Sequence, residues 1–135
     1  MNVDDTTLRA LAASLKFRQM RQEVINSNIA NAETPGYKSK SVEFEAALAR
    51  AVDVDHDGVM TAEDEKHYKL HTGGFSSLEP EIVESSNGVV SDDGNTVDME
   101  NEMASMAENK VMYDASVQLL NKKLALMKYA IINEK

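Results

Sequence analysis

The residues whose types and spacing are best suited to chemistry are the acids of the stretch DVDHDGVMTAED, which runs from Asp53 to Asp64. Asp53, Asp55 and Asp57 occupy alternate positions of a twelve-residue loop, and Gly58 follows them at the sharp turn. This arrangement is the one that wraps oxygen ligands around calcium in an EF-hand loop. The stretch therefore predicts a calcium site, and calcium is the one cofactor that the sequence suggests, although it requires none.

The end of this loop departs from the pattern. Asp64 stands where glutamate closes an EF-hand, and aspartate is one methylene shorter and chelates less well, so we expect weak binding. The flanking segments SVEFEAALARAV and TAEDEKHYKL predict short helices, which makes residues 41–71 a helix-loop-helix. An acidic, solvated connection in which Gly58 only makes the turn stays open as the alternative. The candidate ligands are Asp53, Asp55, Asp57, Val59 through its carbonyl, Thr61 and Asp64.

Other catalytic patterns are weak. His67 and His71 are four residues apart, but HYKLH lacks the glutamate of a zinc-protease helix and no third ligand is indicated. There is no glycine-rich phosphate loop, and no cysteine among the 135 residues for a thiolate site. The sequence predicts that the chain is not an enzyme.

Charge divides the chain into three parts. Residues 1–40 carry six basic and four acidic side chains, residues 41–96 carry three and thirteen, and residues 97–135 carry five and six. The acidic middle argues against a nucleic-acid groove, and the nearly neutral ends are free to pack on each other. The start has neither a basic n-region nor an apolar h-region, and no apolar run reaches 18 residues, so we expect no Sec signal and no membrane span.

The last part has the clearest periodicity. Apolar residues step alternately by four and three, the spacing of a coiled-coil seam, and predict one long helix over about 97–132 that begins after Asn95 or Thr96 as N-cap. The seam consists of Met99, Met103, Met106, Lys110, Tyr113, Val117, Leu120, Leu124, Met127 and Ile131.

A broad apolar stripe over residues 1–33 predicts a first helix to pair with it. The expected fold is therefore mainly α: long terminal helices packed as an antiparallel coiled-coil-like hairpin, with an irregular acidic middle over residues 34–96 that contains the EF-hand-like segment. Two interpretations of the outer stripe stay open, because either the middle segment or other copies of the chain would cover it.

The first helix must end near Ala32. Pro35 lacks an amide hydrogen and clashes with a preceding helical turn, and Pro35-Gly36 suits the centre of a type II turn. The amides of Asn28 and Asn31 are poor helix-interior residues, which suggests that they hydrogen-bond to groups outside the helix.

The stretch NIANAETPGYKSK, residues 28–40, resembles the signature that follows the first helix in bacterial flagellar axial proteins. DGNTVDMENEM is similar to the start of the last helix in the proximal-rod member of that family. The resemblance covers roughly residues 5–50 and 90–132, and the segment 51–75 lies outside it. It implies a structural subunit of the flagellar basal-body rod, located in the periplasm and exported by the flagellar type III apparatus without a cleaved signal.

The resemblance also implies partners and contact residues. The terminal helices would form the channel-side layer of a helical assembly, in contact with other copies, neighbouring rod proteins, the MS ring and the rod adaptor protein. A small calcium-responsive helical binding module is the alternative function. The expected subunit-interface residues are Asn28, Asn31, Thr34, Pro35, Gly36, Tyr37, Met103, Met106, Tyr113, Leu120, Leu124 and Met127.

Overall fold

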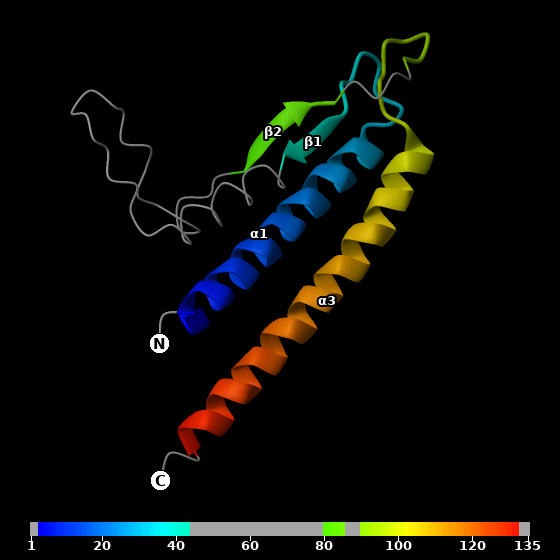
Figure 1. The fold of residues 1–135 in the computed structure, drawn as a ribbon. Coiled ribbons are helices and arrows are strands. Elements are labelled where there is room, and N and C mark those ends of the chain that lie inside the picture. Colours follow the sequence, from blue (N-terminus) through cyan, green and yellow to red (C-terminus); the bar gives the residue numbers. More distant parts are fainter. Residues whose placement is uncertain (1–2, 44–79, 86–89, 133–135) are drawn as a thin grey trace, which may run out of the picture.

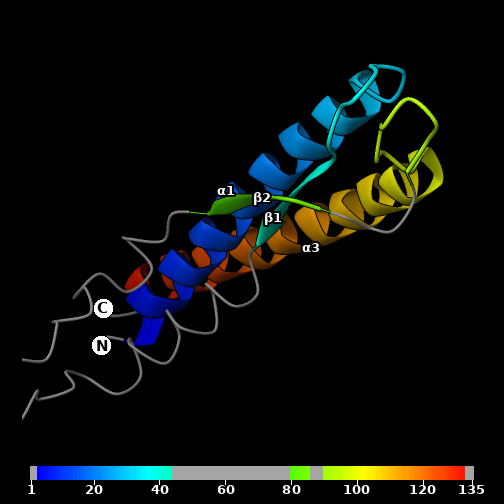
Figure 2. The ribbon, with the colours of Figure 1, turned by 90° about the horizontal axis from the view of Figure 1, so that it is seen from above.

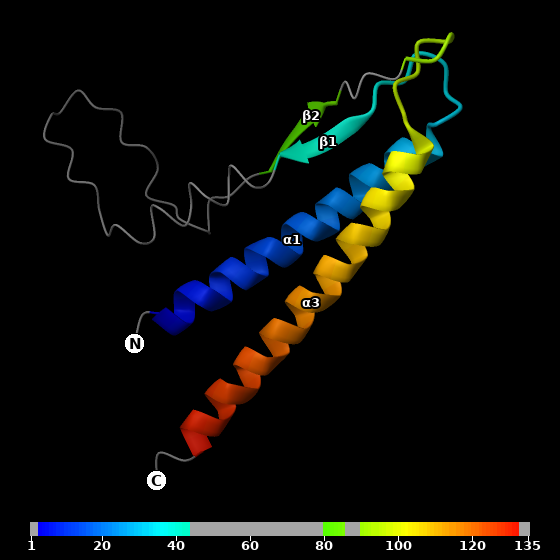
Figure 3. The ribbon, with the colours of Figure 1, turned by 45° about the vertical axis from the view of Figure 1, so that its right-hand side comes forward.

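The computed structural model describes residues 3–43, 80–85 and 90–132. Two long helices pack against each other, α1 (Val3–Ala30) and α3 (Met99–Ile132). A two-stranded sheet of β1 (Lys40–Glu43) and β2 (Glu81–Glu84) lies against α1 (Figure 1). The start of α1 and the end of α3 lie at the same end of the molecule in Figures 1 and 3, so the helices are antiparallel. The predicted mainly helical class with paired terminal helices is confirmed.

Helix α1 ends where its sequence stops favouring a helix. The backbone turns on through residues 31–34, where the N–H of Thr34 donates to the carbonyl of Asn31 at 3.0 Å. The N–H of Tyr37 then donates to the carbonyl of Thr34 at 3.2 Å, which closes a turn around Pro35 and Gly36. Gly36 has φ +70°, the left-handed value that the second central position of a type II turn requires. The predicted exit turn is confirmed.

Helix α3 begins with a different cap from the one predicted. The carboxylate of Asp98 accepts hydrogen bonds from the N–H groups of Glu100 at 3.1 Å and Asn101 at 3.3 Å, so Asp98 is the N-cap. The prediction of Asn95 or Thr96 was wrong because both side chains are occupied elsewhere. Their partners belong to the segment that follows α1.

The face that α3 turns toward α1 is rotated from the predicted seam. Asn109 is the one buried residue of α3, and half-buried side chains precede and follow it at helical spacing. Six of the ten predicted seam residues are exposed, and none is buried. Apolar spacing alone did not locate the contact face because α3 is apolar on several sides. The residues of α3 that are buried or half-buried along this face are Glu102, Ser105, Met106, Asn109, Ser116, Val117, Leu120, Lys123 and Met127.

The strands were not predicted. β1 and β2 pair antiparallel with Lys40 opposite Glu84 and Glu43 opposite Glu81. Seen from above, the pair lies over α1 (Figure 2). Residues 41–43 were expected to start a short helix, and this was wrong: the sheet and the side chain of Asn28 fix them as a strand. The rest of the predicted helix-loop-helix lies outside the described residues.

The described part of the chain has a small apolar core. Its buried hydrophobic side chains are Phe17, Val24 and Ile25, all on α1, whereas its buried polar side chains are Asn28, Ser39, Asn95, Thr96 and Asn109. Neither helix has an apolar stretch long enough to cross a membrane. Polar contacts therefore contribute much of what holds the helices and strands together.

Candidate functional site

The first candidate site is a cluster of hydrogen-bonded polar side chains where the chain leaves α1, and Asn28 lies at its centre. Its side chain is 1% exposed and donates to the carbonyl of Lys40 at 2.8 Å and to the carboxylate of Glu102 at 2.9 Å. Its Oδ1 accepts from the N–H of Lys40 at 3.0 Å and from the hydroxyl of Tyr37 at 3.2 Å. One amide therefore joins α1, β1 and α3, with both of its ends in use.

Asn95 makes comparable contacts from the segment that precedes α3. Its side-chain nitrogen lies 2.8–2.9 Å from the carbonyls of Asn31, Ala32 and Thr34, which follow the last turn of α1. Its Oδ1 accepts from the N–H of Val97 at 2.8 Å. These carbonyls lie just beyond the last residue of α1, in the segment that leads into the exit turn. Asn95, which is 2% exposed, therefore ties the segment that follows α1 to the approach to α3.

Two turns that contain a glycine with positive φ, Gly36 and Gly94, lie in the same region. Gly94 has φ +80°, and a Cβ placed on it would lie 3.7 Å from the Cα of Gly36. The N–H of Gly36 donates to the carbonyl of Asp93 at 2.9 Å, and Lys38 Nζ donates to the carbonyl of Gly94 at 2.9 Å. We call residues 27–40 and 91–102, with these bonds, the polar joint.

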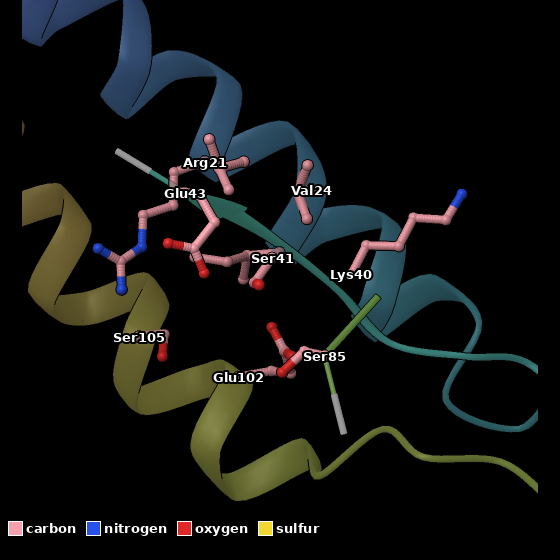
Figure 4. Close-up of a pocket in the computed structure, with 10 residues that line it drawn as sticks. Arg21, Val24, Lys40, Ser41, Glu43, Ser85, Glu102 and Ser105 are labelled. Atoms are coloured by element: carbon pink, nitrogen blue, oxygen red, sulfur yellow. The ribbon is translucent and has the colours of Figure 1, made fainter. Parts of the chain in front are cut away.

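Glu102 lies beside a polar hollow of about 290 Å³ between α1, β1 and α3 (Figure 4). Burial raises the pKa of the Glu102 carboxyl above its usual range, and the nearby Asp98 raises it further. The hydrogen bond from Asn28 and the charge of Arg21 act in the opposite direction without cancelling the rise. Hydroxyls of Ser41, Ser85 and Ser105 also line the hollow, while Lys40 extends away from it in Figure 4.

The second feature is apolar and lies along α3. Eleven large hydrophobic side chains of this helix are exposed, and they are not confined to one stripe. Met112, Leu119 and Leu126 form a row seven residues apart, and other members lie on different sides of the helix. We call this set the apolar surface of α3: Met99, Met103, Val111, Met112, Tyr113, Leu119, Leu124, Leu126, Tyr129, Ile131 and Ile132.

The structure divides the predicted interface residues between these two features. Asn28 is buried within the chain, while Asn31 and Tyr37 are half-buried and hydrogen-bonded within the joint. Thr34, Pro35 and Gly36 are exposed on the exit turn. On α3, Met103, Tyr113 and Leu124 are exposed and Met106, Leu120 and Met127 are half-buried. An interface role for these twelve residues stays a prediction.

The predicted calcium ligands, Asp53 to Asp64, lie outside the described residues, as do His67 and His71. Within residues 3–43, 80–85 and 90–132, no three histidines or acids are grouped so that they could hold a metal ion. The calcium site stays a prediction from the sequence.

Sequence reasoning missed the roles of Asn95, Glu102 and Asn109. Asn95 was noticed as a helix cap, but its three acceptors are more than sixty residues away in the chain, and no local pattern reveals that pairing. Asn109 stands one position before Lys110 of the predicted seam, and the one-residue offset concealed it. An isolated amide between apolar steps is the signal that could have drawn attention to it.

Comparisons with known proteins identify the family of the chain. Residues 8–38, which cover most of α1 and the exit turn, match the family model described as "Flagella basal body rod protein". The chain is 32% identical over 127 residues to the flagellar basal body rod protein FlgB of Proteus mirabilis, covering 91% of each chain. It is 34% identical over 123 residues to FlgB of Aeromonas hydrophila, covering 90% of this chain and 89% of that one, and 28% identical to FlgB of Bacillus subtilis over the full length of both. The chain therefore belongs to the FlgB family of flagellar basal body rod proteins.

Proposed function

We propose that this chain works as a structural subunit of the flagellar rod by packing the apolar surface of α3 against neighbouring subunits. The observation that carries the proposal is the exposure of eleven large hydrophobic side chains on one 34-residue helix. A helix that is apolar on most sides is normally buried on most sides. Among the described residues, α1 covers one side of α3, and we expect neighbouring subunits to cover the rest.

The exposed residues have the character of an interface. Leu119 is 57% exposed, Leu126 58%, Tyr129 70% and Ile131 73%. Large apolar side chains exposed in such number on one helix indicate an interaction surface. Methionines at Met99, Met103 and Met112 add side chains that adapt to irregular contacts. The family is one of structural rod proteins, so the function that follows is assembly and not catalysis.

The proposal extends to partners and location. Other copies of the chain and neighbouring rod proteins are the expected partners of the apolar surface of α3. As the resemblance implies, we also propose contacts to the MS ring and the rod adaptor, a periplasmic location, and export through the flagellar type III apparatus without a cleaved signal. The exposed exit turn, Thr34 to Gly36, is available for such contacts. The alternative of a calcium-responsive module gains no support from the comparisons.

Complementation tests the proposal. A strain that lacks its own copy of this subunit would express the chain with Leu119→Ser and Leu126→Ser, two changes in one row of the apolar surface of α3. We expect loss of rods and swimming, while circular dichroism of the purified variant shows unchanged helix content. Lys122→Ser, an exposed position between them, is the matched control and should swim normally. Normal swimming of the double variant would contradict the proposal.

A further inference from the structure

Asn109 is a buried amide in the contact between α1 and α3. It is 2% exposed, and its Nδ2 donates to the backbone carbonyl of Arg18 at 2.9 Å and to Oε1 of Gln22 at 3.1 Å. Both acceptors belong to α1, and because the Gln22 side chain is found at one position, the pair of bonds exists only while the two helices stay at this register.

The orientation of the Asn109 amide is fixed by its partners. Turning the amide over would place its oxygen against the Arg18 carbonyl and the Gln22 oxygen, two acceptors that have no hydrogen to give. In the orientation present, Oδ1 is buried without a hydrogen-bond partner among the described residues. A buried polar atom in that condition lowers stability, and an apolar side chain here would avoid the loss. A role other than maximum stability is therefore indicated.

The alternatives open to α3 show what that role is. If α3 slipped by one heptad along α1, Asn109 would face Leu11 and Leu15 in one direction or Ile25 and Ile29 in the other. Neither pair offers a side-chain acceptor in place of Gln22, so of the two bonds that Asn109 donates only the one to a backbone carbonyl could form again. The slipped arrangements therefore carry a desolvation cost beyond that of the observed one.

Apolar contacts do not select one register of α3 on α1. Exposed apolar residues lie on several sides of α3, and rows such as Met112, Leu119 and Leu126 would also pack against the stripe of α1. Hydrophobic attraction has no direction, so it discriminates poorly between rotations and slips of such a helix. A single buried asparagine does discriminate, as it does in coiled coils, where it fixes register at a cost in stability.

We propose that Asn109 selects the register and rotation at which α3 pairs with α1, by donating from one side-chain amide to Arg18 and Gln22. Asn109 is a positioning residue of the single chain. The inference therefore stands apart from rod assembly and is tested in solution.

Distance measurement between spin labels tests this directly. The chain has no cysteine, so Lys16→Cys and Lys122→Cys, both at exposed positions on α1 and α3, give two unique labelling sites. A slip of one heptad moves the labels by about 10 Å along the helix axis. Double electron–electron resonance on labelled chain diluted with unlabelled chain should give one narrow distance for the parent protein. A broad or multiple distribution in the parent would overturn the proposal.

The decisive variant is Asn109→Leu in the labelled background. We expect at least one additional distance, differing from the first by up to about 10 Å, with helix content and melting temperature unchanged or raised. Asn121→Leu adds the same apolar group at an exposed position of α3 and should keep the single distance. The exchange Gln22→Asn with Asn109→Gln keeps both amides and their summed length, and should restore the parent distance.

A single parent-like distance in Asn109→Leu would overturn the proposal even if the melting temperature changed, because stability alone is not the role assigned. Should Asn109→Leu lose helix content, Asn109→Ala removes the amide without adding volume and carries the same test. Additional distances in Asn121→Leu to the same extent would likewise overturn it, since any added apolar group would then be enough.

Discussion

The polar joint and the apolar surface of α3 differ in almost every respect. In the joint, small polar side chains such as Asn28, Asn95 and Ser39 are buried and bonded to groups far away in the same chain. Along α3, large apolar side chains such as Leu126 and Tyr129 are exposed. The polar side chains of the joint are hydrogen-bonded within the chain, whereas the side chains of the apolar surface of α3 are exposed to solvent.

This difference indicates how two functions are divided: the polar joint fixes the geometry of the single chain, and we propose that the apolar surface of α3 contacts neighbouring subunits. Hydrogen bonds are directional, so a few buried amides define one geometry for the end of α1, the sheet and the start of α3 even with a small apolar core. Apolar contact is non-directional and gains free energy with area, which suits a surface that several neighbours share. Substitutions in the joint should therefore affect the isolated chain, and substitutions on the apolar surface should affect assembly.

Asn28→Ala should have the largest effect on the isolated chain. It removes four hydrogen bonds and leaves the backbone groups of Lys40 and the Glu102 carboxylate without their partner, which we expect to lower the free energy of unfolding by about 3 kcal/mol. Urea unfolding followed by circular dichroism measures it. Asn26→Ala, an exposed amide of the same helix, is the control and should change stability by no more than about 0.5 kcal/mol. Equal effects of the two variants would show that the joint has no special importance.

Gly36→Ala should have a smaller effect. Its φ of +70° costs a residue with a Cβ about 1–2 kcal/mol, and nothing lies within 4 Å of the added carbon, so backbone strain is the whole expected effect. Thermal unfolding measures the loss. Ser91→Ala, an exposed neighbour of the same joint, provides the reference. A Gly36→Ala variant as stable as the parent would mean that the exit turn relaxes at no cost, and the joint would then be less rigid than its bonds indicate.

Glu102→Gln should have the smallest effect, and it depends on pH. Because burial raises the pKa of Glu102 in the folded chain above its ordinary value of 4.5, its stabilising contribution is fully present below that value and is lost as pH rises through the folded pKa. The glutamine keeps an acceptor for Asn28 and carries no charge. We expect it to melt higher than the parent at pH 7 and equally at pH 3.5. Glu100→Gln, exposed on the same turn, is the control. A difference between Glu102→Gln and the parent that is the same at both pH values would contradict the burial of this carboxyl.

Much of this architecture was predictable from local chemistry. Pro35 and Gly36 specify the exit turn because one fixes φ and the other accepts a positive φ, and neither requires a distant partner. The two helices were predictable from apolar periodicity, which likewise depends only on residues near one another in the chain. The sheet was missed because residues 40–43 form a strand only when Asn28 and β2 supply partners from elsewhere in the chain.

The rotation of α3 was missed for a different reason. Its apolar residues lie on several sides, so periodicity selected a seam through Lys110, whereas the polar Asn109 marks the contact face. The function was predictable because the stretches at residues 28–40 and 93–103 carry the signature of the family. The contacts that these stretches make, from Asn28 to Lys40 and Glu102 and from Asn95 to the segment that follows α1, required the structure.

Thiol protection tests the division between the joint and the apolar surface most directly. In a chain with no other cysteine, Leu126→Cys and Ser39→Cys would each be exposed to a maleimide reagent, first as purified protein and then in isolated basal bodies. Leu126 is 58% exposed and Ser39 is 3% exposed in the single chain. We expect Leu126→Cys to react rapidly in the purified protein and to be protected in the basal body, while Ser39→Cys is protected in both. A Leu126→Cys variant that swims and reacts equally fast in both states would contradict it.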